Sequence, residues 1–269
     1  MRGLNLIFSG LAISCLVVSL VVPRAVALEV ASDELEASEI ARRADDNMRS
    51  DRTAFKARMI VESPRLSSAR TVAFSSWEDR AAKSSFIRIH EPAKDKGSGF
   101  LKLHPNLWMY VPRVERTMRI PPSMMLSSWM GSDFTNDDLV RDSSEVDDYS
   151  HELIGIEPSL ESAGGRRAYV VQYTPREEAA VVWGRIVAWI DVENYAPLRQ
   201  EFFDEDGKQL RVLVFSDHRE IDGRWVPHHW SLTPLEKPGH STVIELEEMR
   251  FDLKLDERIF TKRHLEETR

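Results

Sequence analysis

The chain has 269 residues, of which 42% are hydrophobic and 30% are charged, and its formal net charge at pH 7 is −8. An acidic chain of this kind is not expected to bind nucleic acid, or an anionic bilayer by charge alone. Its length is sufficient for one large domain with a substantial apolar core.

The N-terminal 27 residues have the pattern of a secretory signal. Arg2 precedes an apolar run over residues 4–22, and the small-residue sequence Ala25-Val26-Ala27 follows, as at a signal cleavage site. We therefore expect cleavage after Ala27, a periplasmic location, and one domain over residues 28–269. An uncleaved membrane anchor is the alternative, because the run approaches the length of about 20 residues that spans a bilayer.

Cysteine usage supports the same compartment. Cys15 is the single cysteine of the sequence, so the exported part is expected to have no disulfide, no thiol nucleophile and no thiolate metal site. A lipoprotein interpretation would use Cys15, but this residue lies inside the apolar run and not at its end.

The first predicted element of the exported part is a helix. Ser32 or Asp33 is a suitable N-cap, and acidic residues fill the first turn. The apolar residues that recur at helical spacing are Leu35, Ile40, Ala41, Ala44 and Met48.

Strands dominate the rest of the sequence. Alternating polar and apolar residues, with polar or Pro/Gly breaks between the runs, predict strands in the first half. These are residues 55–61, 70–78, 84–90, 99–104, 106–111 and 115–120.

Hairpin signals mark the second half. Gly164-Gly165 separates strand candidates 149–157 and 167–174, Asp206-Gly207 separates 197–204 from 208–217, and Asp222-Gly223 separates 211–221 from 224–232. An Asp-Gly pair favours a type I′ turn, because both central residues of that turn need a positive φ.

Two further runs complete the sheet. Residues 181–192 are apolar on both faces, with Ala188 on one face and Trp183 and Trp189 on the other, so both faces should be covered. In residues 241–255 the apolar alternation changes phase near Glu247 or Glu248, which predicts a β-bulge. We expect ten or eleven antiparallel strands in a strongly curved sheet, with an N-terminal helix and a helical insertion around residues 122–140.

The segment of residues 107–139 holds five of the nine methionines and two of the seven tryptophans. A strand over 107–111 is followed by the charged stretch 113–119, by Pro121-Pro122 and by an apolar helical stretch over 124–130. Flexible thioether side chains repack around irregular apolar partners, so this stretch is either a lid over an apolar ligand or ordinary core.

We find no specific catalytic constellation and no nucleotide-binding motif, so we expect a protein that is not an enzyme and has no cofactor. His228 and His229 are adjacent on a predicted strand and point to opposite faces, which disfavours a shared metal. The acid pair Asp137-Asp138 is interpreted as helix-capping or solvent-facing charge.

Three arginines recur at every third residue near the centre of the chain: Arg113, Arg116 and Arg119. On a strand this spacing alternates faces, so they do not form one stripe. They are expected to surround an exposed turn, with docking to an acidic partner as the alternative.

The chain resembles the outer-membrane lipoprotein-sorting proteins of Gram-negative bacteria, the LolA-like group, and is closer to its broad branch than to the lipoprotein carrier itself. Two blocks carry the resemblance. The first runs from Leu107-Trp108-Met109-Tyr110-Val111-Pro112 to Asn136-Asp137-Asp138-Leu139, and the second from Trp189-Ile190-Asp191 to Asp222-Gly223-Arg224-Trp225-Val226-Pro227.

The resemblance implies an incomplete β-barrel of mainly β (α+β) class, with a helical lid on the concave side and a cavity for lipid, lipoprotein acyl chains or another apolar ligand. Its implied partners are an inner-membrane exporter and an outer-membrane acceptor. An accessory protein that contacts such an exporter through the same apolar surface is the alternative. The ligand-binding candidates are Trp108, Tyr110, Met118, Ile120, Met124, Met125, Trp129, Met130 and Phe134, with Trp77, Phe86, Trp183 and Trp189 as weaker candidates on the sheet.

Overall fold

The computed structural model describes residue 28 and residues 36–140, 144–179 and 181–267. The expected signal and its cleavage site, and the Ser32 or Asp33 cap, lie outside these residues. Within them, no helix has both the length and the apolar character needed to cross a bilayer.

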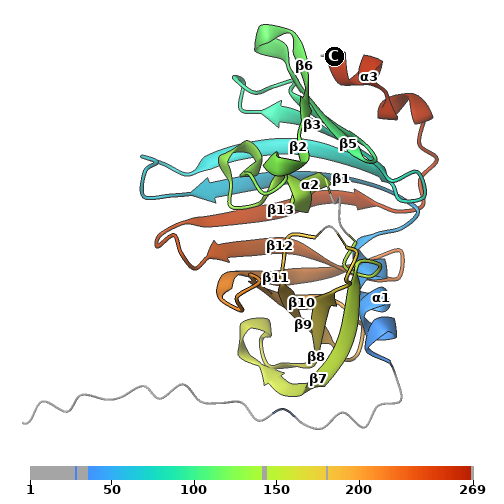
Figure 1. The fold of residues 1–269 in the computed structure, drawn as a ribbon, viewed down its shortest axis with the longest axis vertical. Helices are drawn as coiled ribbons and strands as arrows, with labels where there is room; N and C mark the ends of the chain where they lie inside the picture. Colours follow the sequence, from blue (N-terminus) through green and yellow to red (C-terminus); the bar gives the residue numbers. More distant parts are fainter. Residues whose placement is uncertain (1–27, 29–35, 141–143, 180, 268–269) are drawn as a thin grey trace, which may run out of the picture.

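A single antiparallel sheet forms most of the molecule (Figure 1). Its strands are β1 (Arg52–Glu62), β2 (Arg70–Asp79), β3 (Ser84–Glu91), β4 (Gly99–Leu103), β5 (Asn106–Val111), β6 (Arg116–Ile120), β7 (Tyr149–Leu160), β8 (Arg166–Pro175), β9 (Arg185–Asp191), β10 (Pro197–Phe203), β11 (Gln209–Ile221), β12 (Arg224–Pro234) and β13 (Ser241–Arg250). The described residues thus form thirteen strands instead of ten or eleven, because each short run, including the five-residue β4 and β6, pairs as a strand of its own.

The described residues also form three α-helices and five short 3-10 turns. They are α1 (Ala37–Met48), α2 (Asn136–Val140) and α3 (Lys262–Glu266), with η1 (Pro112–Val114), η2 (Pro122–Met124), η3 (Trp129–Gly131), η4 (Glu161–Ala163) and η5 (Glu257–Phe260). The stretch 124–130 was expected to be one helix. It contains the end of η2 and the start of η3, because Ser128 between them has a ψ of 122° and forms an antiparallel bridge with Thr135, and because Met130 has a left-handed φ of 50°.

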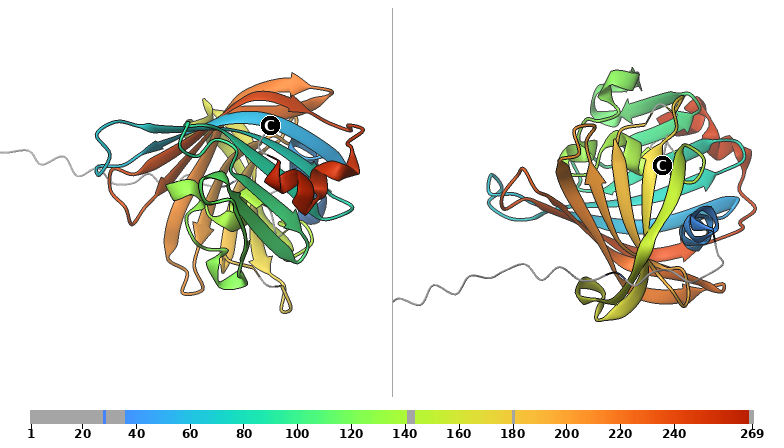
Figure 2. Two further views of the ribbon diagram at one scale, coloured as in Figure 1. Left: turned by 90° about the horizontal axis from the view of Figure 1, so that it is seen from above. Right: turned by 60° about the horizontal axis from the view of Figure 1, so that its bottom comes forward.

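The strand order is β6-β5-β4-β3-β2-β1-β13-β12-β11-β10-β9-β8-β7. The sheet curls into an incomplete barrel, as the turned views in Figure 2 show, and β6 and β7 form its two edges. The expected fold class is confirmed. Helix α1 packs against the β7–β12 part of the sheet and α3 against β4 and β5 (Figure 1).

At a turn and at a β-bulge, the backbone has the conformation that the sequence predicts. Asp222 and Gly223 both have positive φ, 51° and 76°, as the type I′ turn between β11 and β12 requires. In the β1–β13 pair, Lys56 lies opposite Glu248 and Ala57 opposite Leu246, so Glu247 is the extra residue of a β-bulge. The bulge restores the phase that brings both Leu246 and Met249 into the core.

Apolar side chains cover both faces of the curved sheet. The main core fills the concave face beneath α1, and a second cluster on the convex face contains Phe86, Leu101, Tyr110 and Leu265. The buried Arg88 guanidinium holds α3 over this second cluster: its Nη1 donates to the Gly97 and Leu265 carbonyls, and its Nη2 donates to the His264 carbonyl.

Candidate functional site

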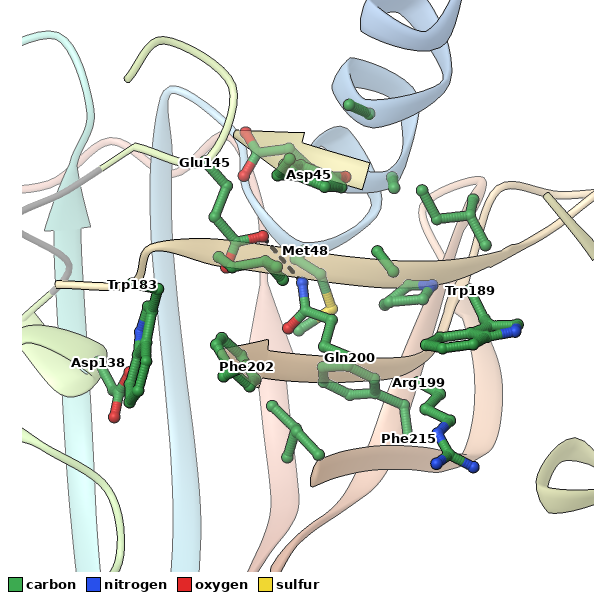
Figure 3. A pocket seen from close by; sticks show the side chains of 18 of the residues that line it. Asp45, Met48, Asp138, Glu145, Trp183, Trp189, Arg199, Gln200, Phe202 and Phe215 are labelled. Atoms are coloured by element: carbon green, nitrogen blue, oxygen red, sulfur yellow. Dashed lines mark hydrogen bonds between the residues drawn. The ribbon is translucent and has the colours of Figure 1, made fainter. Parts of the chain in front are cut away.

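A cavity with a volume of about 160 Å³ lies on the concave face, between α1 and strands β7–β12 (Figure 3). Aromatic and aliphatic side chains form most of its wall. They come from α1, from the sheet and from the segment before α2, and include Ala44, Met48, Phe134, Tyr173, Trp183, Ala188, Phe202, Phe215 and Trp230. Such a wall suits an apolar group, with the few polar side chains left to orient it.

Helix α1 is fixed across the cavity by hydrogen bonds from one buried side chain. Asn47 Nδ2 donates to the Asn194 carbonyl at 2.8 Å, and Asn47 Oδ1 accepts from the Trp225 amide at 2.8 Å. Arg224 Nη1 donates to the Asp46 carbonyl near the end of the helix. These bonds join the end of α1 to the β9–β10 loop and to the start of β12, and so hold the helix against the cavity.

One end of the cavity is polar. Gln200 Nε2 donates to Glu145 Oε2 at 2.8 Å, the contact drawn in Figure 3, and Asp45 and Arg49 of the α1 end lie nearby. Burial raises the pKa of the Tyr149 and Tyr173 phenols, and the Glu145 carboxylate acts in the same direction. Both phenols are therefore protonated at neutral pH.

A smaller cavity of about 40 Å³ lies on the other side of α2, towards β1, β2 and β3. Phe134, Asp138 and Trp230 line both cavities. The segment of residues 121–140, here called the lid segment, therefore enters the concave face between the two spaces. Its removal would join them into one longer trough.

The lid segment is attached to the sheet at several points. The Trp129 ring is fully buried, with ring-centroid distances of 5.3 Å to Phe74 and 5.4 Å to Phe100. The Thr242 hydroxyl of β13 accepts from the Asp133 amide at 3.0 Å and donates to the Asp133 carboxylate at 2.9 Å.

The strongest polar attachment of the lid segment joins Asp138 of α2 to Arg211 of β11. Arg211 Nη1 and Nη2 donate to the two Asp138 carboxylate oxygens at 2.6 and 2.7 Å. Asp138 also accepts from the Thr135 amide, and Thr135 Oγ1 accepts from the Asp138 amide, which is a capping box. Burial opposes ionisation of Asp138, but Arg211 and Thr135 outweigh it and hold the pKa of the carboxyl below its ordinary value.

The sequence expectation for Asp138 was half right. The residue caps a helix, as expected, but it is mostly covered instead of facing solvent, with 15% of its side chain exposed, because its partner arginine lies on the concave face of the sheet. Arg211 was not singled out by the sequence. The two residues are 73 positions apart, and no local pattern pairs them.

Of the nine predicted ligand-binding residues, all within the described part of the chain, Phe134 lines the cavity. Trp129 is buried in the main core, and Ile120, Met125 and Met130 are partly buried against it. Met118 and Met124 are each 47% exposed and lie outside the cavity wall.

Trp108 and Tyr110 lie on the opposite, convex face of β5. Both belong to the cluster beneath α3, and the Lys262 ammonium lies 3.4 Å from the Trp108 ring centroid. Trp77 and Phe86 join the same cluster, with their rings stacked at 5.6 Å. The structure thus separates these four aromatic residues from the cavity.

Trp183 does line the cavity, together with Ala188. The sequence pattern placed these two residues on opposite faces of one strand over 181–192. This was wrong because β9 begins at Arg185 and Trp183 precedes it in a loop, so strand alternation does not extend to this side chain.

The three arginines of the β5–β6 hairpin are exposed, and the β5–β6 register places Arg116 and Arg119 on opposite faces, as expected. In the part of the chain that the structure describes, no group of three or more His, Cys, Asp or Glu side chains has an arrangement that would hold a metal ion.

An open antiparallel sheet around an apolar cavity, covered by α1 and the lid segment, is the fold of LolA-like proteins. A DUF1329 family protein from Desulfovibrio piger superposes with a TM-score of 0.74 at 25% identity, covering 85% of this chain and 97% of that chain. A domain from Vibrio parahaemolyticus, named for outer-membrane lipoprotein sorting, gives 0.72 at 23% identity, covering 86% and 98%. A LolA superfamily protein from Nitrosomonas europaea gives 0.71 at 22% identity, covering 86% and 99%.

A family model with the description "Uncharacterized protein" matches residues 81–267, so the chain belongs to that family, and its fold is LolA-like. A search of curated proteins finds no match.

Proposed function

We propose that the protein is a periplasmic carrier, which binds a lipid, the acyl chains of a lipoprotein or another apolar ligand on the concave face and carries it between the inner and outer membranes. The observation that supports this proposal is the cavity itself, an apolar space of about 160 Å³ between α1 and the curved sheet. The lipoprotein-sorting name of one structural neighbour and the LolA name of another support the same class of ligand.

The cavity in this state is smaller than the ~300–1,000 Å³ of typical ligand sites. A long acyl chain therefore needs the lid segment to move, so that the cavity joins the space of about 40 Å³ beyond Phe134. We regard the structure as the closed state. Trp129, Met125, Met130 and Ile120 then belong to the seat of the lid segment, and Phe134 occupies space that a ligand would fill.

Carriage of this kind needs no covalent step. Burial of an acyl chain stabilises the complex by about 0.8 kcal/mol per methylene group, and release follows when an acceptor binds the chain more favourably. The proposed partners are therefore an inner-membrane complex that loads the cavity and an outer-membrane acceptor that empties it.

The test is native and lipid-extraction mass spectrometry of the protein purified from its native envelope, with uptake of a fluorescent acyl probe by the emptied protein. A stoichiometric lipid or acylated peptide supports the carrier and names the cargo class. Ala188→Phe, which places a ring in the cavity, should abolish probe uptake, whereas the matched change Ala81→Phe at an exposed turn should not. An empty protein that takes up no probe would overturn the proposal.

One observation favours a second function, that of an accessory protein of an inner-membrane exporter. The lid segment and the adjoining β5–β6 hairpin expose four large apolar side chains, Val114, Met118, Met124 and Leu126. A cluster of exposed apolar residues is a common feature of protein contact sites. Two observations together would favour this alternative. The emptied protein would take up no acyl probe, and it would cross-link from these four positions to a membrane protein.

A further inference from the structure

Arg211 is a cation of the cavity wall that lies between two aromatic rings, apart from the polar end with Asp45 and Arg49. Its side chain is 6% exposed, and its guanidinium carbon lies 4.1 Å from the Trp183 ring centroid and 4.2 Å from that of Phe202. Figure 3 shows Trp183 and Phe202 beside Asp138 at one side of the cavity. These aromatic contacts come from the sheet side and do not involve the lid segment.

The guanidinium is therefore positioned before any anion approaches it. A planar, always-charged group that presents two parallel N–H donors matches the oxygen atoms of a carboxylate or a phosphate. In the closed state this face is occupied by Asp138, which belongs to the lid segment. The third donor, Nε, has no hydrogen-bond partner among the described residues.

Movement of the lid segment would remove Asp138 and leave Arg211 buried without a counter-ion. An uncompensated buried charge is strongly unfavourable. Opening would thus be favoured by any ligand that brings its own oxyanion to the same two donors. The apolar tail of such a ligand would follow the wall formed by Leu213, Phe215 and Trp230, which line the cavity beyond Arg211.

We propose that Arg211 is the head-group receptor of the cavity and that Asp138 is an internal mimic of the ligand, so that the preferred ligand is an amphiphile with one apolar chain or more and an oxyanion head. This inference rests on the proposed carrier function. It narrows the ligand to anionic amphiphiles, in which a carboxylate or a phosphate is attached to the chain, and disfavours neutral acyl groups.

The experiment compares four probes by titration calorimetry with the full exported chain: dodecanoate, dodecyl phosphate, the neutral dodecanol, and inorganic phosphate. The wild-type protein should bind the two anionic amphiphiles more tightly than dodecanol. Asp138→Asn removes the internal competitor, so the affinity for both anionic amphiphiles should rise about tenfold, within the usual range of coupling between two ligands. The affinity for dodecanol should change far less.

A double variant, Arg211→Met with Asp138→Asn, leaves no unpaired charge and keeps the protein testable if Arg211→Met alone fails to fold. It should bind all three twelve-carbon probes equally. The matched control is Arg185→Met, which removes an arginine stacked 4.0 Å from the Phe203 ring on the other face of β9, away from the cavity. This control should leave the head-group preference unchanged.

The outcomes separate the two proposals. Equal binding of all twelve-carbon probes by the wild type and by Asp138→Asn overturns the head-group receptor and leaves the carrier standing. Inorganic phosphate that binds as tightly as dodecyl phosphate identifies a small-anion site and also overturns it. Failure of every twelve-carbon probe to bind overturns the carrier and this inference together.

Discussion

Arg70 of β2 donates a hydrogen bond from Nη2 to the main-chain oxygen of Met130, at the point where the lid segment turns into the concave face. Met130 has a φ of 50° and Gly131 a φ of 72°, so the backbone here is in the left-handed region that a non-glycine residue rarely adopts. The arginine thus holds a conformation that costs about 1–3 kcal/mol locally.

We predict that Arg70→Gln loosens the lid segment without unfolding the sheet. Loss of a charge-assisted hydrogen bond weakens local structure by about 1.5–3 kcal/mol, so amide hydrogen exchange over residues 128–137 should accelerate by at least about tenfold. Arg65→Gln, at an exposed loop position, is the control. Unchanged exchange in the Arg70 variant would show that the contact does not stabilise the segment.

Trp129 provides a test of whether the lid segment is also core. Its ring is fully buried, so Trp129→Ala should lower the free energy of unfolding by about 3–5 kcal/mol. Its Nε1 is buried without a hydrogen-bond partner among the described residues. Trp129→Phe should therefore cost much less, because it removes an unsatisfied polar group and keeps most of the ring volume.

Urea unfolding measures both tryptophan variants, with Met124→Ala as the control. Met124 is 47% exposed, and its truncation should change stability by less than about 0.5 kcal/mol. A Trp129→Ala protein as stable as the wild type would mean that the ring makes no net contribution to the core.

Gly184 allows the cavity loop to approach β10 closely. A Cβ at this position would lie 2.5 Å from the Asp204 carbonyl oxygen, and the Gly184 amide donates to the Phe203 carbonyl. Gly184→Ala should destabilise the fold by about 1–3 kcal/mol, the usual cost of overpacking, and should weaken acyl-probe binding because Trp183 is displaced.

The control for Gly184 is Gly207→Ala, where a Cβ meets no atom within 4 Å and φ is 80°. That change should lower stability modestly, by about 1 kcal/mol, and should leave probe binding intact. Thermal unfolding and probe titration of the two variants distinguish a backbone effect from a cavity effect. Equal loss of probe binding in both would contradict the prediction.

His218 should make stability depend on pH. Burial lowers the pKa of its imidazole, the Pro197 carbonyl at 2.8 Å from Nε2 opposes that shift, and Arg166 adds to it. Because the folded state binds the proton less tightly than the unfolded state, stability is complete above the ordinary pKa of about 6.5 and is lost as pH falls below it.

We therefore expect His218→Gln to reduce the loss of stability between pH 6.5 and pH 5, since a glutamine amide can still donate to the Pro197 carbonyl and does not titrate. The measurement is the free energy of unfolding of both proteins at several pH values. Burial also lowers the pKa of His90 and His151. The His218→Gln variant should therefore keep part of the wild-type dependence of stability on pH. Parallel curves for the two proteins would rule out a contribution from His218.

Local signals predicted the sheet well because each one acts over a few residues. The Asp222-Gly223 turn follows from the φ values that the turn needs, and the bulge at Glu247 follows from the phase of the apolar residues on either side. The curvature of the sheet and its fold class also agree with the resemblance that the sequence shows.

The candidate site was harder to predict because it depends on tertiary pairing. Trp108 and Tyr110 were predicted to bind the ligand, but α3 covers the convex face on which they lie, and nothing local indicates which face borders a cavity. Arg211 meets Asp138 from a distant strand, and Trp183 reaches the cavity through a loop. An arginine in an apolar strand was the one available signal, and it is weak without its partner.

The strand order has a consequence for how the two edges face each other. All twelve neighbouring pairs are antiparallel, and the sheet that the structure describes has thirteen strands, an odd number. Direction alternates from strand to strand, so β6 and β7 at the two ends point the same way. Joining them would need a parallel ladder, whose hydrogen bonds differ from those of every other pair. The sheet therefore cannot close between β6 and β7 in the antiparallel pattern. A mutation that merely lengthens either edge strand would leave it open.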